Sequence, residues 1–195
     1  MPFRDYETLD LDGVALVPID VQQGFDHDRW GERNNPDAER HVAELLAAFR
    51  EADLPVVHVR HDSTELDSPL RPDRAGNAFK PEAEPTREEP VVARDVDGAF
   101  VGTDLESRLR EAGVQRPVFV GFTTDRGVST TARMAANFGF EPYVVADAAV
   151  TFEREFDGTR YAAEQNHRLA LAQLDGEFAT VVETATLLAA LEARE

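Results

Sequence analysis

The sequence contains no cysteine among its 195 residues, and lysine occurs only once, as Lys80. The absence of cysteine excludes disulfide bonds, thiolate metal sites and a thiol nucleophile. No stretch approaches the ~20 consecutive apolar residues that a membrane-spanning helix requires. The first residues, MPFRD, also lack the basic and then apolar layout of a secretion signal. We therefore expect a cytoplasmic protein.

The sequence has far fewer basic than acidic residues. Lys and Arg total 20 against 38 Asp and Glu, which gives a formal net charge of −18 at pH 7. Such a surface repels nucleic-acid phosphates and anionic lipids, so we predict neither nucleic-acid nor membrane partners. The hydrophobic content of 42% nevertheless suffices for a globular core. The length fits a single domain over residues 1–195, because domains usually have roughly 100–200 residues.

Short apolar runs alternate with amphipathic stretches along the chain, a pattern typical of α/β proteins. It predicts a three-layer α/β/α, Rossmann-like domain around a six-stranded, mainly parallel sheet. The expected strands are 14–20, 54–59, 89–93, 117–122, 143–146 and 178–182. The expected helices are 37–52, 103–113, 128–138, 162–174 and 185–193.

Ligands of such folds bind beyond the carboxyl ends of the strands, which directs attention to the segments that follow each apolar run. One connection, residues 63–88, is much longer than the others and contains Pro69, Pro72, Pro81 and Pro85. Loops of more than ~12–15 residues in a compact domain are usually functional or disordered. We therefore predict that this loop is a lid over the strand ends.

Three ordered segments carry a resemblance to a known family. They are 17–22 (VPIDVQ) with Phe25, the Ala99-Phe100 pair with Gly102 and Thr103 after it, and 121–132 (GFTTDRGVSTTA). Together they resemble the isochorismatase-like cysteine hydrolase superfamily. The likeness spans nearly the whole chain, and 30–36 (WGERNNP) fits a bacterial subgroup.

The resemblance implies a catalytic triad of Asp, Lys and Cys. In this sequence the acid is present as Asp20, whereas Arg94 stands at the lysine position and Gly127 at the cysteine position. Amide hydrolysis through an acyl-thioester is therefore excluded. The resemblance further implies a cis peptide bond at Phe122–Thr123. The amides of Thr123 and Gly127 can still form an anion-binding hole.

Isochorismatases within the superfamily resemble this chain in having glycine at the cysteine position. There an acid protonates a vinyl ether and water completes the hydrolysis, which by analogy makes Asp20 the general acid. Arginine at position 94 would lower the pKa of Asp20, whereas burial would raise it. The sequence leaves the balance of these two effects open.

Substrate-binding candidates follow from the same motifs and loops. Arg126 can meet an anionic substrate or be a solvated rim residue. The rings of Phe25, Trp30 and Phe79 can form a wall or belong to the core. The amide side chains can orient a substrate or bind loop backbone. The candidates are Gln22, Phe25, Trp30, Asn77, Phe79, Phe100, Thr123 and Arg126.

His58 and His61 are three residues apart, which places them on opposite faces of an extended segment. Metal-binding relatives take an acid and several histidines from one loop, and that set is missing here. We therefore interpret both as structural histidines and predict no metal and no cofactor.

Two functions remain open at this point. The first is a thiol-independent hydrolase that acts on a small carboxylated substrate of the vinyl-ether type, or on another substrate of secondary metabolism. The second is an inactive or repurposed family member that binds a small anion or a partner protein. The resemblance implies a homodimer or homotetramer in either case.

Overall fold

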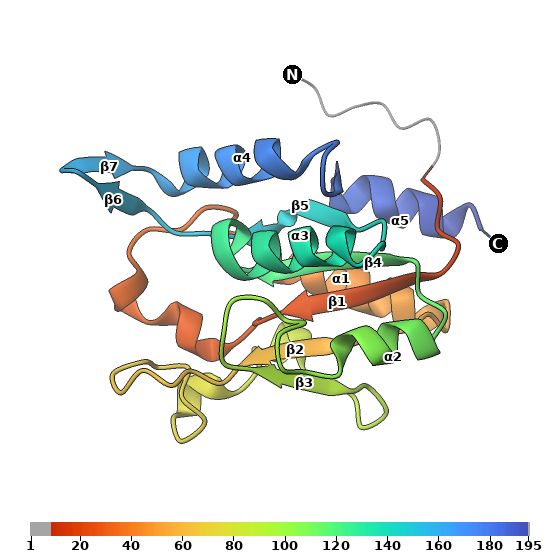
Figure 1. Cartoon of the computed structure of the whole chain (residues 1–195), viewed down its shortest axis with the longest axis horizontal. Coiled ribbons are helices and arrows are strands. Elements are labelled where there is room, and N and C mark those ends of the chain that lie inside the picture. Colours follow the sequence, from red (N-terminus) through yellow and green to blue (C-terminus); the bar gives the residue numbers. More distant parts are fainter. Residues whose placement is uncertain (1–8, 195) are drawn as a thin grey trace.

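The computed structural model describes residues 9–194, and a six-stranded sheet lies at its centre (Figure 1). The strand order is β3-β2-β1-β4-β5-β8, and all neighbours are parallel. The strands are β1 (Val14–Ile19), β2 (His58–His61), β3 (Val91–Arg94), β4 (Arg116–Phe122), β5 (Tyr143–Val150) and β8 (Thr180–Val182). The predicted α/β fold class is thereby confirmed.

Helices cover both faces of this sheet. The helices α1 (Ala38–Glu51) and α5 (Thr184–Glu192) pack on one face, where Leu45, Phe49 and Leu187 join the core. The helices α2 (Leu105–Glu111), α3 (Ser129–Asn137) and α4 (Ala163–Leu174) cover the other. Within residues 9–194, no helix combines the length and apolar character needed to cross a membrane. The cytoplasmic location stays a prediction.

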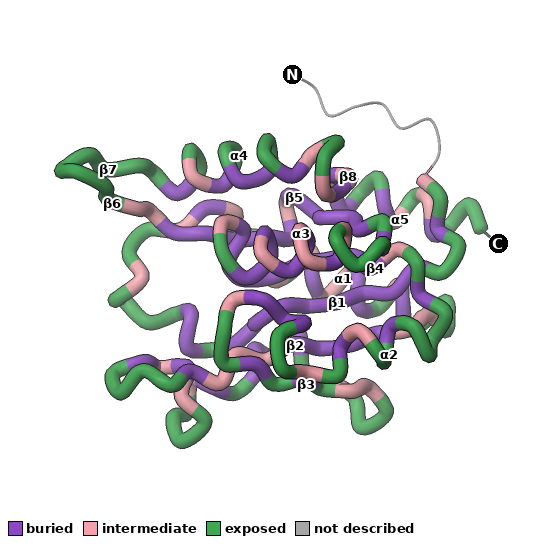
Figure 2. The backbone as a smooth tube through the Cα atoms, in the orientation of Figure 1, coloured by how far each residue is buried: buried purple, intermediate pink, exposed green. Residues whose placement is uncertain are grey.

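The continuous apolar runs form the sheet because their side chains are buried on both faces. In β1, Val14 and Leu16 belong to the core under α1, whereas Ala15, Val17 and Ile19 belong to the core under α2 and α3. Every residue of β1 is buried, as the purple trace of this strand shows (Figure 2). Because alternate side chains are buried on opposite faces, the face toward which each side chain of the strand points is fixed.

Strand β2 differs from its prediction because it begins at His58 rather than at residue 54. Pro55 has no N–H to donate to a ladder. It only accepts a hydrogen bond from Leu16 at 2.9 Å, and Val56 forms an isolated bridge with Leu16. Regular pairing therefore starts after the proline.

A two-stranded hairpin was not predicted from the sequence. Its strands β6 (Arg154–Phe156) and β7 (Thr159–Tyr161) pair antiparallel and project beyond the main sheet (Figure 1). The turn contains Asp157 and Gly158, both with positive φ. An Asp-Gly pair between two short strands is a strong hairpin signal.

The long connection between β2 and β3 is held by side chains. It contains the short helices η3 (Ala75–Asn77) and η4 (Pro81–Ala83). The amide of Asn77 donates to the carbonyl of Leu70 at 2.8 Å, to Asp62 Oδ1 at 3.0 Å and to the carbonyl of His61 at 3.1 Å. The segment is thus fixed against the carboxyl edge of the sheet.

Candidate active site

Asp20 follows β1 directly and lies at the centre of the carboxyl edge. Its side chain is buried, and its backbone is left-handed with φ +52°, a region that aspartate enters more readily than most residues. The backbone N–H of Asp20 donates to the carbonyl of Val59 at 2.9 Å. Neighbouring strands thus hold the carboxyl group in place.

Arg94 reaches this carboxyl group from the end of β3. Its Nη2 donates to Asp20 Oδ2, and its Nη1 donates to the carbonyl of Val96. Because β2 lies between β3 and β1, the arginine side chain spans one strand to make the ion pair. Only 2% of Asp20 and 4% of Arg94 are exposed, so water screens this pair very little.

Burial raises the pKa of Asp20 to about 7, although the guanidinium of Arg94 acts in the opposite direction. The carboxylates of Asp97 and Asp62 raise this pKa further. The balance that the sequence left open is therefore decided in favour of burial. Near neutral pH a large share of the molecules carries a protonated Asp20.

Gly127 completes this group from the turn η5 (Thr124–Val128) that precedes α3. A Cβ atom on Gly127 would lie 2.7 Å from Arg94 Nη2, 3.0 Å from the carbonyl oxygen of Phe122 and 3.4 Å from Asp20 Oδ2. The guanidinium therefore occupies the space beside residue 127. The peptide bond Phe122–Thr123 is cis, as the family resemblance implied.

Two polar atoms of the ion pair have no hydrogen-bond partner in the described part of the chain. They are Asp20 Oδ1 and Arg94 Nε, and both are buried. Buried polar atoms are rarely left without a partner. A protonated carboxyl group and a guanidinium N–H are donors that suit a carboxylate or carbonyl oxygen of a ligand.

A cavity of about 90 Å³ lies beside this pair, and all of its walls come from the carboxyl edge. Seven of the predicted site residues line it: Asp20, Phe25, Trp30, Arg94, Thr123, Arg126 and Gly127. Residues of the long loop form another part of the wall: Ser63, Glu65, Ser68 and Leu70. The position of this loop agrees with a cover over the strand ends.

One wall of the cavity is aromatic. The ring of Phe25 stacks on Phe122 with centroids 4.8 Å apart and lies 5.3 Å from Trp30. The indole N–H of Trp30 donates to the carbonyl of Gly24 at 2.8 Å, which fixes this ring. An apolar wall beside a polar end is typical of small-molecule sites.

Two further arginines lie at the cavity. Arg126 is largely exposed and pairs weakly with Asp97 at 3.4 Å. Arg154, at the start of β6, is held by Asp125, whose Oδ2 lies 3.0 Å from Arg154 Nε. The neighbouring hydroxyl of Thr151 also donates to Asp125. Together with Arg94, these side chains bring three guanidinium groups to the cavity, each of them paired with an aspartate.

Four predicted site residues do not line this cavity. The amides of Gln22 and Asn77 bind loop and strand backbone. The ring of Phe79 packs edge-on against His58 at 5.7 Å, and Phe100 contacts the rings of Phe138 and Phe140 beside the core. For Gln22, Asn77 and Phe79 this is the structural alternative that the sequence analysis left open, whereas Phe100 was predicted only as a substrate-binding residue.

Sequence reasoning assigned no site role to several residues that line the cavity, namely His61, Asp97, Arg154 and the four loop residues named above. His61 and Asp97 follow predicted strands, so their positions indicated that they could lie at the site. Arg154 gave none, because the hairpin that carries it was not predicted. Lys80 lies elsewhere, paired with Asp26 and, at 3.2 Å, with Glu39.

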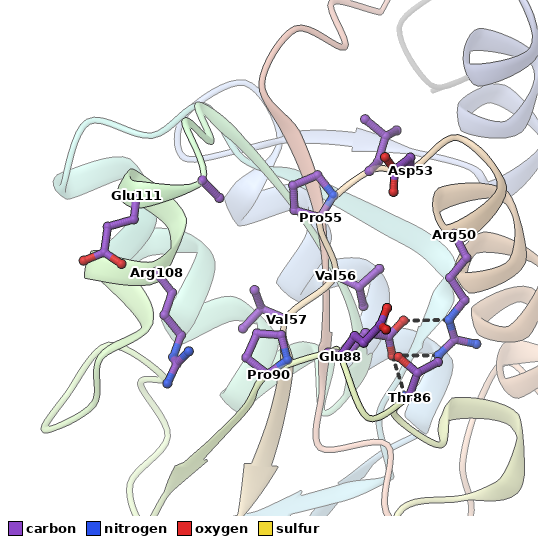
Figure 3. Close-up of a pocket in the computed structure, with 13 residues that line it drawn as sticks. Arg50, Asp53, Pro55, Val56, Val57, Thr86, Glu88, Pro90, Arg108 and Glu111 are labelled. Carbon is purple, nitrogen blue, oxygen red and sulfur yellow. Dashed lines mark hydrogen bonds and ion pairs between the residues drawn. The ribbon is translucent and has the colours of Figure 1, made fainter.

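A larger cavity, of about 700 Å³, lies at the opposite end of the sheet (Figure 3). Most of its walls precede β2 and β3, and the end of α2 supplies the rest. Within it, Arg50 donates two hydrogen bonds of 2.7 and 2.8 Å to Glu89. Open parallel sheets bind ligands at their carboxyl ends rather than here. We therefore place the candidate site at the smaller cavity.

The described residues contain no group of three or more His, Asp or Glu side chains arranged to hold a metal ion. The absence of a metal stays a prediction. Near the site, His167 is buried and its Nδ1 lies 2.9 Å from the hydroxyl of Thr124. Burial lowers the pKa of His167 to about 4, so this imidazole is neutral and supports the turn η5.

Comparisons with known proteins agree with this architecture. The isochorismatase domain model matches residues 14–186. A solved isochorismatase-family structure from Chromobacterium violaceum ATCC 12472 has 43% sequence identity and a TM-score of 0.91, covering 95% of this chain and 97% of that one. The uncharacterised isochorismatase family protein YrdC of Bacillus subtilis is 38% identical over 89% of this chain and 94% of its own length. The secreted isochorismatase effector Isc1 of Verticillium dahliae is 32% identical over 87% of each.

Proposed function

The chain belongs to the isochorismatase family, and from this premise we propose that it is a thiol-independent hydrolase of a small carboxylated vinyl ether. Asp20 is the general acid. The observation that carries the proposal is this buried carboxyl group, whose pKa is raised to about 7 and whose Oδ1 has no partner among the described residues. A general acid works best when its pKa lies near the working pH.

The reaction begins when Asp20 transfers its proton to the terminal carbon of the vinyl ether. The ether carbon becomes an oxocarbenium centre, and Asp20 becomes a carboxylate beside the guanidinium of Arg94. This ion pair stabilises the charge that Asp20 acquires. Water then adds to the cationic carbon, and the resulting hemiketal breaks into an alcohol and a 2-keto acid.

The missing nucleophile favours this reaction over amide hydrolysis. Gly127 has no side chain, and the sequence has no cysteine that could replace it. Vinyl-ether hydrolysis requires a proton donor and water but no covalent intermediate. The chain retains the acid of the triad, which donates the proton in this reaction, whereas isochorismatases by the family resemblance keep a lysine where this chain has Arg94.

The guanidinium groups at the cavity support a carboxylated substrate in this proposal, although Asp20, Glu65 and Asp97 line the cavity as well. Arg126 and Arg154 lie at the same small cavity as Arg94, and an arginine can bind a carboxylate through two N–H groups. The amides of Thr123 and Gly127 supply two further donors in this proposal. The aromatic wall of Phe25 and Trp30 suits a planar, unsaturated substrate.

Isochorismate, a carboxylated vinyl ether, tests the proposal through the release of pyruvate. We expect the parent protein to release pyruvate and Asp20→Asn to lower kcat by about 10²-fold or more, because general-acid catalysis contributes 10²–10⁴-fold. Asp12→Asn, an exposed change just before β1 and thus at the amino end of the sheet, is the matched control and should keep the parent rate. Equal rates for the parent and Asp20→Asn, or no release at all, would reject the proposal.

The second candidate is a member that binds a small anion without turnover. It is favoured by one observation, the direct ion pair between Asp20 and Arg94. In this pair Asp20 Oδ2 already accepts a hydrogen bond from Arg94. Calorimetric binding of pyruvate or isochorismate to the parent, without consumption of isochorismate, would identify this function. Assembly into a homodimer or homotetramer stays a prediction under both functions.

A further inference from the structure

His61 lies at the same cavity as the Asp20–Arg94 pair, at the end of β2 between the two strands that carry them. Its register partner on β3 is Arg94. The imidazole is half-buried, and its Nδ1 is buried without a hydrogen-bond partner in residues 9–194. Buried polar atoms are rarely left without a partner, so this nitrogen is a candidate acceptor for a ligand or a water molecule that reaches it.

The backbone of His61 is held by side chains on both of its polar groups. The N–H of His61 donates to Gln22 Oε1 at 2.8 Å. Its carbonyl accepts from Gln22 Nε2 and from Asn77 Nδ2, each at 3.1 Å. Gln22 and Asn77 therefore fix the position of His61 beside the cavity, although neither lines the cavity itself.

The surroundings of His61 keep its ring neutral. Burial lowers the pKa of His61 below its ordinary value of 6.5, and the guanidinium groups of Arg94 and Arg126 lower it further. The carboxylates of Asp97 and Asp62 act in the opposite direction, each with a smaller effect than burial or Arg94 and a larger one than Arg126. A neutral imidazole accepts a proton, whereas the protonated Asp20 donates one, and opposed shifts of this kind separate acid from base in active sites.

His58 shows that this arrangement is specific to one face of the strand. It lies three residues earlier, is fully buried, and its Nε2 contacts Glu89 Oε2 at 2.9 Å. Glu89 belongs to the wall of the cavity at the opposite end of the sheet. The Nδ1 of His58 also lacks a partner among the described residues, but only His61 of the two lines the candidate site. The structural interpretation of the sequence therefore suits His58.

We propose that His61 is the general base of the site and takes a proton from the water that adds to the substrate cation. This inference rests on the proposed vinyl-ether hydrolysis. The oxygen of water bonds to the cationic carbon while one of its protons passes to His61. When the hemiketal breaks, His61 returns that proton to the departing alcohol oxygen. The remaining hydroxyl proton of the hemiketal passes to the carboxylate of Asp20, which restores both groups.

The first test compares His61→Asn with the control variant His27→Gln, whose histidine lies on the exposed segment between η1 and η2. We expect kcat for pyruvate release from isochorismate to fall about 10²-fold or more in His61→Asn, with KM and melting temperature close to the parent values. The parent profile of kcat against pH should be bell-shaped. Its acid limb reports protonation of His61, and its alkaline limb reports ionisation of Asp20.

The acid limb should vanish in His61→Asn, whereas the alkaline limb should remain. A purely structural role for His61 would lower the melting temperature and leave the shape of the profile unchanged. An unchanged acid limb in the variant would overturn the inference.

The second test does not depend on turnover. Diethyl pyrocarbonate acylates neutral imidazoles, and peptide mass spectrometry locates the modified histidine. We expect His61 to be modified at pH 6.5 and protected by added pyruvate. If the parent releases no pyruvate but His61 is modified and protected, the proposed function fails and the placement of a neutral base at the cavity holds. If His61 resists modification, the inference is wrong whatever the activity.

Discussion

The absence of a side chain at Gly127 leaves room for the guanidinium group of Arg94. The guanidinium lies where a side chain at position 127 would begin, since a Cβ there would be 2.7 Å from Arg94 Nη2. Arg94 is also tied to Asp20 and to the carbonyl of Val96, so it cannot withdraw without breaking buried contacts. The two departures from the family triad are therefore physically coupled.

Gly127→Cys should for this reason destabilise the protein by about 1–3 kcal/mol, the usual cost of overpacking a well-filled site. Arg94→Lys provides room because an ammonium group is smaller than a guanidinium. We expect the double variant Arg94→Lys with Gly127→Cys to regain most of the lost stability. Urea unfolding of the parent, both single variants and the double variant gives the coupling energy, and additive effects would contradict this account.

Among the structural elements, the long loop of residues 63–88 forms part of the cavity wall. Its Gly76 packs on Gly24, where a Cβ on Gly76 would be 2.8 Å from the Cα of Gly24 and 2.6 Å from the carbonyl oxygen of Pro69. Asn77 next to it makes the three hydrogen bonds that tie the loop to the sheet edge. The loop is thus a fixed wall of the cavity.

Asn77→Asp should disrupt that wall, because it replaces an N–H donor with an oxygen that faces two carbonyl groups. Leaving buried carbonyl groups without a donor costs about 1–3 kcal/mol each. We expect lower stability in urea, faster hydrogen exchange over residues 63–80, and a raised KM for isochorismate. Asn137→Ala, at the end of α3, is the control and should leave exchange in the loop unchanged.

Most elements were predictable because buried parallel strands read as continuous apolar runs. Strand β1 and the helix α1 appear within one or two residues of their predicted ends. The hairpin was not predicted, because its strands have three residues each and are mostly exposed, so they lack a hydrophobic signal. Only its Asp157-Gly158 turn marked it.

The candidate site was predictable to the extent that strand ends converge. Asp20, Arg94 and Gly127 are brought together because they lie at or beyond the carboxyl ends of β1, β3 and β4. The direction of loop side chains was not predictable, because it is set by contacts distant in sequence. Phe100, for example, turns toward Phe138 and Phe140 and away from the cavity.

Charge dominates at the scale of the whole molecule. A net charge of −18 makes the acidic surface repel itself, whereas the cavity gathers Arg94, Arg126 and Arg154. These arginines are paired with Asp20, Asp97 and Asp125, yet they concentrate cationic groups at one place on an otherwise acidic molecule. Such contrasts act over the screening length of the solution, which is about 10 Å at 0.1 M salt.

Raising the NaCl concentration from about 0.05 M to about 0.5 M should consequently stabilise the fold, because screening weakens the self-repulsion of the surface. The same change should weaken the binding of pyruvate at the cavity, since its arginines are screened as well. Scanning calorimetry and titration calorimetry measure the two effects. A melting temperature that falls with salt would contradict the assignment of net repulsion as a destabilising force.

The crowding of residue 127 by the guanidinium also constrains how this site can change over generations. A cysteine that arises first meets an occupied space, and a lysine that arises first gains no sulfur to assist. Each single step toward the thiol chemistry of other family members thus lacks a benefit on its own. The resemblance to cysteine hydrolases implies a lysine and a cysteine at these two positions, so a change to that chemistry would require both substitutions, with the lysine first to provide room for the cysteine.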